Sequence, residues 1–248
     1  MKKSLHLKRT GSIVGILGAA IAFGVSGTPA LATTDTRPTE YIVGGQSTNS
    51  PNIVQLSFNT AGEQGTFGCT GEAISSQWVL TARHCTEGSQ NMKAYYSNDT
   101  SNPGPAYAAD RVVNSPYGDV GLIHLKSPHP VSQYAKLGNG YTPRAGDTGS
   151  IFGYGLRGNR VPADWLFTAR VSVLGQSTDA YGGKAVHVRG IDGASNHGDS
   201  GGPLVINGVI VGVCSTGDTA DPGSNINAGS NYANLNDHRA WITQNTGV

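Results

Sequence analysis

Residues 196–203 read NHGDSGGP, a serine and an aspartate among three glycines, just before the apolar residues 204–206. A serine hydroxyl is a poor nucleophile at neutral pH. It needs a positioned base, usually a histidine, and a third group that fixes the histidine tautomer. Glycines also make permissive turns, so this segment alone fits either a plain turn or a reactive Ser200. The choice depends on partners elsewhere in the chain.

One of the seven histidines stands out as a base. His84 lies in WVLTARHC, at the end of an apolar strand and directly before Cys85. Cys69 lies 16 residues upstream of Cys85, and a hairpin of that length brings its two ends together, which favours a disulfide between them. By the chain-entropy model a loop of this size contributes about 3 kcal/mol. A histidine fixed beside a disulfide is a candidate base as well as a candidate structural residue.

The third group should be a buried carboxylate, because a desolvated anion fixes a tautomer most strongly. Asp119 lies in GDVGLIHL and immediately precedes an apolar strand, where an unpaired charge would be costly. We interpret it as the candidate carboxylate, although a plain turn aspartate would give the same local pattern.

The composition predicts an all-β protein, with 36 glycines and 13% charged residues in a chain of 248. Such a chain favours many turns and short strands over long helices. Strand-like runs separated by turn residues are typical of a β-barrel or sandwich. They are residues 53–58, 72–74, 78–81, 120–125, 149–152, 169–174, 185–189, 203–206 and 209–213. A helix is expected at the end of the chain, where Asn236 and Asp237 would cap a run through Trp241 and Ile242.

The first 41 residues are not expected to belong to the folded domain. Residues 1–9 carry four basic side chains, residues 13–25 are apolar, and residues 30–32 have a small-x-small cleavage pattern. Together they predict a signal peptide over residues 1–32 and secretion. A membrane anchor is the alternative, but the apolar run is short for a spanning helix. The polar residues 33–41 are interpreted as a pro-segment, and the domain spans residues 42–248.

Residues 42–248 hold 12 Lys and Arg against 14 Asp and Glu, a formal net charge of −2. This balance offers no basic face, so neither nucleic acid nor an acidic membrane is an expected partner. The histidines outside the candidate site show no metal-ligand spacing, so we expect no metal and no other cofactor. They are His124, His187, His197 and His238, once His6 of the signal peptide and the loop residue His129 are set aside. Of these, His197 is expected at the rim of the site.

The three cysteines lie in the part of the chain that is expected to be exported, where disulfides are allowed. If Cys69 and Cys85 form a disulfide, Cys214 has no cysteine partner. We expect a buried free thiol, because free cysteine often behaves as a small apolar residue. A catalytic thiol is the alternative, and it would lack a base of its own.

Five strings, in this order, resemble the secreted chymotrypsin/trypsin-like serine proteases, of a bacterial type. They are IVGG at 42–45, TARHC at 81–85, DVGLIHL at 119–125, GYG at 153–155 and GDSGGP at 198–203. The resemblance covers residues 42–248. It implies two six-stranded Greek-key β-barrels with a C-terminal helix and a boundary near residues 135–148. It also implies a serine endopeptidase that cleaves polypeptides, acts as a monomer and is open to protein protease inhibitors.

On the matching positions, the resemblance implies that Ser200 is the nucleophile, His84 the general base and then acid, and Asp119 the tautomer-fixing carboxylate. The amides of Gly198 and Ser200 would form the oxyanion hole, where loss of one donor typically costs about 10²–10³ in rate. A bulky residue at position 198 would turn its amide away.

The resemblance also implies an ion pair between a new chain end and the loop that carries Ser200. Cleavage after Tyr41 would free the Ile42 ammonium, which would insert beside Asp199. Activity should then fall in alkali as this amine loses its proton, from a reference pKa of about 8 raised by Asp199. It should fall in acid as His84 is protonated. Lys or Arg often stands at the position of Tyr41 in such zymogens, so Tyr41 indicates an aromatic-preferring activator or self-processing.

The substrate pocket departs from the family pattern. Its base falls on Ala194, where a trypsin carries aspartate, next to Ser195. Ser215 and Gly217 belong to the near wall, with Thr216 in place of a tryptophan, and Ser230 narrows the far wall. Small or medium uncharged side chains are therefore expected before the scissile bond, unless a loop shift brings in Asp192 or Asp218. Asn196 also replaces the first cysteine of the disulfide that usually braces this pocket.

Two other functions compete with the protease. A catalytically silent relative that binds a partner would usually lose a triad member or the Ile-Val end, and all of these are present. A serine esterase would need GxSxG between a strand and a helix, whereas the segment around Ser200 leads into Pro203 and a strand.

Overall fold

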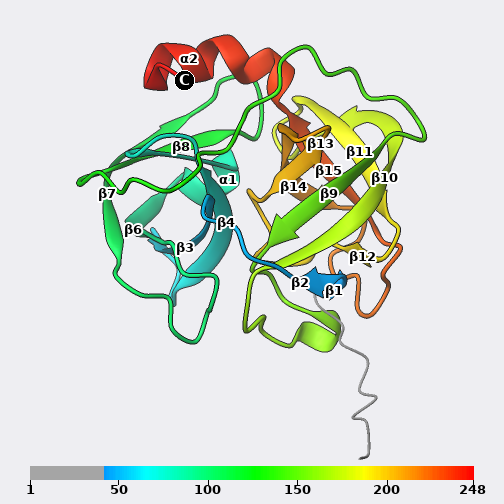
Figure 1. The fold of residues 1–248 in the computed structure, drawn as a ribbon, viewed down its shortest axis with the longest axis horizontal. Helices are drawn as coiled ribbons and strands as arrows, with labels where there is room; N and C mark the ends of the chain where they lie inside the picture. Colours follow the sequence, from blue (N-terminus) through cyan, green and yellow to red (C-terminus); the bar gives the residue numbers. More distant parts are fainter. Residues whose placement is uncertain (1–41) are drawn as a thin grey trace, which may run out of the picture. The chain divides into compact units, whose positions relative to one another are not determined.

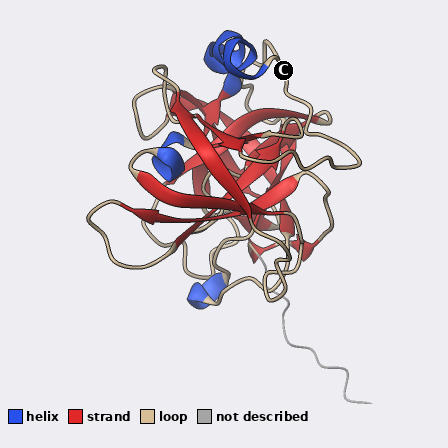
Figure 2. Ribbon diagram, turned by 90° about the vertical axis from the view of Figure 1, so that its left-hand side faces the viewer, coloured by secondary structure: helices blue, strands red, loops and turns tan. Residues whose placement is uncertain are grey.

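The computed structural model describes residues 42–248. The predicted signal peptide, pro-segment and cleavage site after Tyr41 lie outside the described residues. Within residues 42–248, none of the helices combines the length and apolar character needed to cross a bilayer. Figure 2 shows that strands make up most of the regular structure, as the composition predicts.

The first half of the described chain forms a closed antiparallel barrel (Figure 1). Its strands are β3 (Ile53–Thr60), β4 (Phe67–Ala73), β5 (Trp78–Thr81), β6 (Ser89–Tyr95), β7 (Tyr107–Asn114) and β8 (Gly121–Leu125). The order around the barrel is β3-β4-β5-β8-β7-β6, and β6 returns to pair with β3. This return of the fourth strand beside the first is the Greek-key arrangement. Alternate residues of β3, Val54, Leu56 and Phe58, are buried in the barrel core, as the two-residue period of a strand requires.

The second half forms another closed barrel. Its strands are β9 (Thr148–Gly153), β10 (Phe167–Thr178), β11 (Lys184–Gly190), β13 (Pro203–Ile206), β14 (Val209–Gly217) and β15 (Gly229–Asn234). Their order is β11-β15-β14-β13-β9-β10, closed by the pairing of β10 with β11. Asn207 and Gly208, between β13 and β14, have positive φ of 52° and 78°. A two-residue Asn-Gly turn of type I′ requires these angles.

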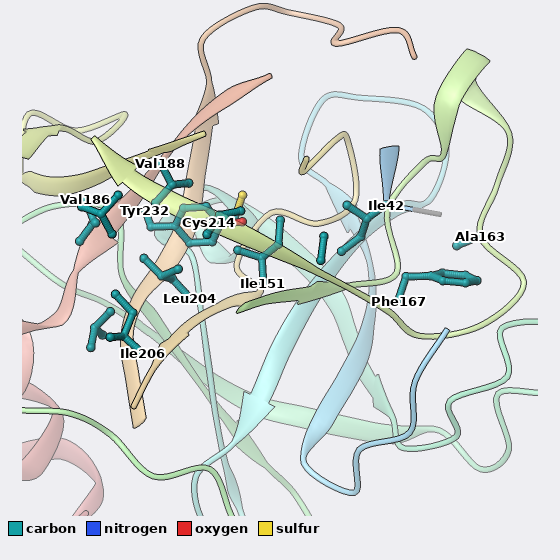
Figure 3. Packing of buried hydrophobic residues seen from close by; sticks show 14 residues of the cluster. Ile42, Ile151, Ala163, Phe167, Val186, Val188, Leu204, Ile206, Cys214 and Tyr232 are labelled. Carbon is teal, nitrogen blue, oxygen red and sulfur yellow. The ribbon is translucent and has the colours of Figure 1, made fainter. Parts of the chain in front are cut away.

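Two short strand pairs attach the start of the described chain to the second barrel. β1 (Val43–Gly44) pairs with β12 (Gly193–Ala194), and β2 (Gln46–Ser47) pairs with the start of β10. Ile42 is buried and belongs to the apolar cluster of this barrel, as Figure 3 shows. The first described residue is therefore held in the core.

The two-barrel fold predicted from the resemblance is confirmed. The predicted runs fall within or overlap observed strands, and 78–81 and 203–206 coincide with β5 and β13. β6, β7 and β15 were not predicted. Most side chains of β6 and β7 are at least partly exposed, so these strands carry little of the apolar signal on which the predictions relied. The predicted boundary at 135–148 lies in the connection between β8 and β9.

The C-terminal helix is present, but the predicted cap is wrong. A short 3-10 helix, η2 (Leu235–His238), leads into α2 (Arg239–Thr246). The side chain of Asn234, and not that of Asn236 or Asp237, accepts the hydrogen bond of the first turn, from the Asn236 amide at 3.0 Å. Asn236 instead bonds the backbone of Tyr141 with both ends of its side-chain amide, which fastens the chain between the barrels.

Candidate active site

Three segments bring the candidate catalytic residues together. His84 lies in a one-turn helix, α1 (Arg83–Thr86), directly after β5, and Asp119 lies directly before β8, so both belong to the first barrel. Ser200 lies in the loop before β13 of the second barrel. His84 and Ser200 both line one groove.

The Asp119 carboxylate fixes the His84 ring. Its Oδ2 atom lies 2.7 Å from His84 Nδ1 and accepts the hydroxyl of Ser215 at 2.6 Å, while Oδ1 accepts the His84 backbone amide at 2.9 Å. A carboxylate oxygen only accepts, so Nδ1 carries the proton and Nε2 keeps its lone pair. Burial raises the pKa of Asp119, but its bonds to His84 and Ser215 outweigh burial and hold that pKa below the ordinary value. Asp119 is therefore an anion at neutral pH.

The predicted disulfide is confirmed and lies beside both other residues. Cys69 and Cys85 are bonded, with their Cα atoms 6.4 Å apart. The two sulfur atoms and a ring nitrogen of His84 lie within 4.8 Å of one another, and Cys85 Sγ lies 3.8 Å from the carbonyl oxygen of Ser200. Both sulfurs are used in the disulfide, so this group offers no thiolate ligands to a metal. The disulfide instead ties α1 to β4, and Cys85 lies against the loop of Ser200.

The loop of Ser200 is held so that two of its amides point at no protein acceptor. Gly198 has φ of +95°, and a Cβ there would lie 2.8 Å from the Cα of Gly155. The Gly198 carbonyl accepts the Thr70 hydroxyl at 2.9 Å, and the Ser200 carbonyl accepts the Thr70 amide at 2.9 Å. Within residues 42–248, the amides of Gly198 and Ser200 donate to no protein atom. Both remain available to an oxyanion.

The position of Asp199 explains why the GYG string has glycine at positions 153 and 155. Its buried carboxylate accepts the amides of Gly155 and Asn196, each at 2.8 Å, and a Cβ on either Gly153 or Gly155 would collide with it. Burial raises the pKa of Asp199 to about 7, although the two amides act to lower it. No Lys, Arg or His side chain within residues 42–248 pairs with this carboxylate.

A cavity of about 300 Å³ lies on one side of Ser200. Of the predicted pocket residues, Ser195, Ser215 and Gly217 line it, together with Thr216 and Cys214. Ala194 and Ser230 are not among its lining residues. Ala194 is buried in the pairing of β12 with β1, and the Ser230 hydroxyl lies 2.7 Å from that of Ser195. The Ser230 hydroxyl therefore lies behind Ser195, outside the cavity wall.

Both nearby aspartates are bound to side chains outside the cavity lining. Asp192 pairs with Arg170 at 2.7 Å and does not line the cavity. Asp218 lines the cavity but pairs with His187 at 2.9 Å. Cys214 is the buried free thiol that the sequence predicts, and burial raises its pKa to about 12, so it is uncharged at neutral pH.

A second, larger hollow of about 810 Å³ lies on the other side of Ser200 and contains His84 and Gly198. Its wall combines apolar and polar side chains and contains one carboxylate, that of Glu63. The apolar residues include Phe58, Phe67, Leu156 and Pro162. His197, the predicted rim residue, is exposed and lines both hollows.

Thr70 and Asp179 were missed by the sequence analysis. The Thr70 hydroxyl donates to the Gly198 carbonyl and accepts the Tyr154 amide at 3.1 Å, so it connects the barrels beside the loop of Ser200. Asp179 accepts the backbone amide of Asp119 at 2.9 Å. Neither lies in a chemical motif, because each acts on a segment that is distant in the sequence.

The chain is similar to known proteases in sequence and in fold. The trypsin family model matches residues 42–242. An uncharacterized peptidase of Corynebacterium glutamicum (strain R) is 31% identical over 244 residues, covering 95% of this chain and 81% of the relative. Trypsin I-P38 of Gallus gallus is 30% identical over 227 residues, covering 83% of this chain and 86% of that protein. A scabies mite inactivated protease paralogue, SMIPP-S-I1, has a similar structure with a TM-score of 0.67 at 21% identity, covering 82% of this chain and 99% of that one.

The chain belongs to the trypsin family of serine proteases. It is a hydrolase of the serine endopeptidase class that acts on polypeptides.

Proposed function

We propose that His84, Asp119 and Ser200 form a catalytic triad that cleaves peptide bonds through an acyl-enzyme. His84 Nε2 takes the proton of the Ser200 hydroxyl as Oγ attacks the scissile carbonyl, and the Gly198 and Ser200 amides stabilise the oxyanion. The intermediate collapses as the imidazolium gives its proton to the leaving amine. Water, deprotonated by His84, then attacks the acyl-enzyme and releases the acid and Ser200. The observation that carries the proposal is the Asp119–His84 bond, which leaves Nε2 as the base.

Covalent labelling tests the nucleophile. Protein that begins at Ile42 is incubated with a serine-directed phosphonylating reagent and mapped by peptide mass spectrometry. Label is expected on Ser200 alone, because this residue shares the groove with His84 and belongs to the loop with the two free amides. Ser200→Ala is the matched variant and should take up no label. Label at another residue, or none on folded protein, would contradict the proposal.

The competing proposal is a catalytically silent protein that binds a partner through the same scaffold. The likeness to an inactivated protease paralogue, at 21% identity, concerns the fold alone and does not favour silence. The orientation of His84 and the two unused amides support an active site, since a binding scaffold needs neither. Labelling of Ser200 decides between the two.

We also propose that the protein is secreted as a zymogen and is activated by cleavage after Tyr41. Asp199 supports this step, because it is a buried carboxylate with no cationic partner within residues 42–248. Ile42 is itself buried, so a new ammonium at that residue would be formed next to the protein core. The enzyme is expected to act as a monomer and to be open to a protein protease inhibitor that occupies the groove as a substrate does.

The cavity of about 300 Å³ is proposed to hold the side chain before the scissile bond and to favour small or medium uncharged residues. Ser195 lines it with the Ser230 hydroxyl behind, and Asp218 in its wall is hydrogen-bonded to His187. Ala194, proposed as the pocket base, would act indirectly, by setting the position of the neighbouring Ser195.

Removing the Ser230 side chain is expected to deepen this cavity. Ser230→Gly should raise kcat/KM for leucine or phenylalanine before the scissile bond about tenfold relative to alanine, because a pocket discriminates by the volume it excludes. Parallel assays of peptides that differ only at this residue measure the ratio. Ser150→Gly, a change of the same kind at a strand position away from the cavity, is the control. An unchanged ratio in Ser230→Gly would place the specificity pocket elsewhere.

A further inference from the structure

The turn at residues 179–183 joins β10 to β11 in the second barrel, yet it contacts Asp119 of the first. Asp179 is buried, with 7% of its surface exposed. Its Oδ2 atom accepts the Asp119 backbone amide at 2.9 Å, and its Oδ1 atom accepts the amides of Tyr181 and Gly183 at 2.8 and 2.9 Å. The carboxylate thus binds its own turn with one oxygen and the neighbouring barrel with the other.

The same turn reaches the Asp119 side chain by a second path. The amide of Ala180 donates to the Ser215 hydroxyl at 3.0 Å, and this hydroxyl donates to Asp119 Oδ2 at 2.6 Å. The Ala180 bond occupies a lone pair of Ser215, so the hydroxyl proton is directed at the carboxylate. Backbone and side chain of Asp119 are therefore fixed by consecutive residues of one turn.

Two glycines permit the close approach of the turn to Asp119. A Cβ on Gly118, directly before Asp119, would collide with the Asp179 carboxylate, and so would a Cβ on Gly183. The turn is fastened to the first barrel again where the Tyr181 hydroxyl donates to Glu87 at 2.5 Å and Arg83 stacks on the Tyr181 ring.

We propose that Asp179 is a positioning residue that holds Asp119 in the orientation His84 requires. This inference rests on the proposed triad and adds to it a contact from the opposite barrel. A displaced Asp119 would still bind His84, but with poorer alignment of Nε2 toward Ser200, and misplacement of about 1 Å costs on the order of 10² in rate. The contribution is therefore to kcat and not to substrate binding.

Asp179→Asn is the informative variant. The Asn oxygen can still accept the turn amides of Tyr181 and Gly183, while the side-chain NH₂ faces the Asp119 amide, where donor meets donor. We expect kcat to fall about 10- to 100-fold with KM within about twofold of the wild type. Asp147→Asn is the matched control, because Asp147 is a partly buried acceptor of a tyrosine hydroxyl away from the site, and its kcat should stay within about twofold.

A double-mutant cycle separates positioning from a merely structural role. If Asp179 acts through Asp119, then Asp179→Asn should cost little more, about threefold at most, once Asp119 is already asparagine. A structural defect would instead lower kcat by the same factor in both backgrounds, and that result would overturn the inference. If Asp119→Asn has no effect by itself, the proposed triad fails, which is a distinguishable outcome.

Thermal unfolding of each variant reports folding. If Asp179→Asn does not fold, Asp179→Ser takes its place, since serine keeps a hydroxyl acceptor for the turn but is too short to reach Asp119. An unchanged kcat in a folded variant of either kind would also overturn the inference.

Discussion

Asparagine in place of Asp119 is expected to lower kcat about 10⁴-fold. In the native site, Asp119 Oδ2 accepts from His84 Nδ1 at 2.7 Å and from Ser215 at 2.6 Å. An NH₂ group at this point donates, so His84 Nδ1 would have to accept and the ring proton would move to Nε2. The ring could then no longer take the proton of Ser200. The fold is expected to survive, because asparagine has nearly the same shape.

A second Asp–His pair in the same barrel supplies the control. Asp110 lies 2.7 Å from His124 Nδ1 at an exposed position outside the site. Asp110→Asn removes the same kind of bond, and its kcat should remain within about twofold of the wild type. Steady-state kinetics on one peptide substrate measure both variants. Equal losses in the two variants, or none in Asp119→Asn, would contradict the proposed role of Asp119.

Cleavage of the Tyr41–Ile42 bond is expected to raise kcat/KM about 10²- to 10³-fold, the size of effect that one firmly held oxyanion-hole donor has. The physical reason lies at Asp199, whose carboxylate precedes Ser200 and has no cationic partner within residues 42–248. An Ile42 ammonium would supply that partner and fix the loop that carries the Gly198 and Ser200 amides.

The design compares two chain ends that differ only in the free amine. A specific protease site placed before Ile42 releases either Ile42 itself or Ile42 preceded by Gly-Ser, and kcat/KM is measured for both products and for the uncut chain. Only the product that begins at Ile42 should gain activity, and Asp199→Asn should abolish the gain. Equal activity of all three chains would exclude the ammonium switch.

The stability of the uncut chain should depend on pH with an unusual sign. The pKa of Asp199 is about 7 in the folded protein, raised by burial from 3.8. Between these values the unfolded chain loses the proton and the folded chain keeps it, so the free energy of unfolding decreases as pH rises from about 4 to 7. The loss is up to about 4 kcal/mol. Urea unfolding at pH 4 and pH 8 should show this difference in the uncut chain and a much smaller one in Asp199→Asn.

The sequence alone determined those features of this protein that depend on a few consecutive residues. His84 was found because an apolar strand and a cysteine flank it, and Asp119 because a charge before a buried strand needs a partner. The disulfide followed from the length of one hairpin, and the fold class from apolar runs of strand length. Such features depend on neighbours in the chain, so the sequence is sufficient to indicate them.

Only the tertiary structure decided which groups meet when the segments that carry them are distant in the sequence. Ala194 and Ser230 fall at the expected places in the sequence, yet β1 covers the first and the Ser195 hydroxyl engages the second. Asp179 binds the Asp119 amide across 60 residues of sequence. The physical reason is the same in each case. A buried polar group must have a hydrogen-bond partner, which is often a backbone amide. Because every non-proline residue carries such an amide, the sequence does not indicate which one is used.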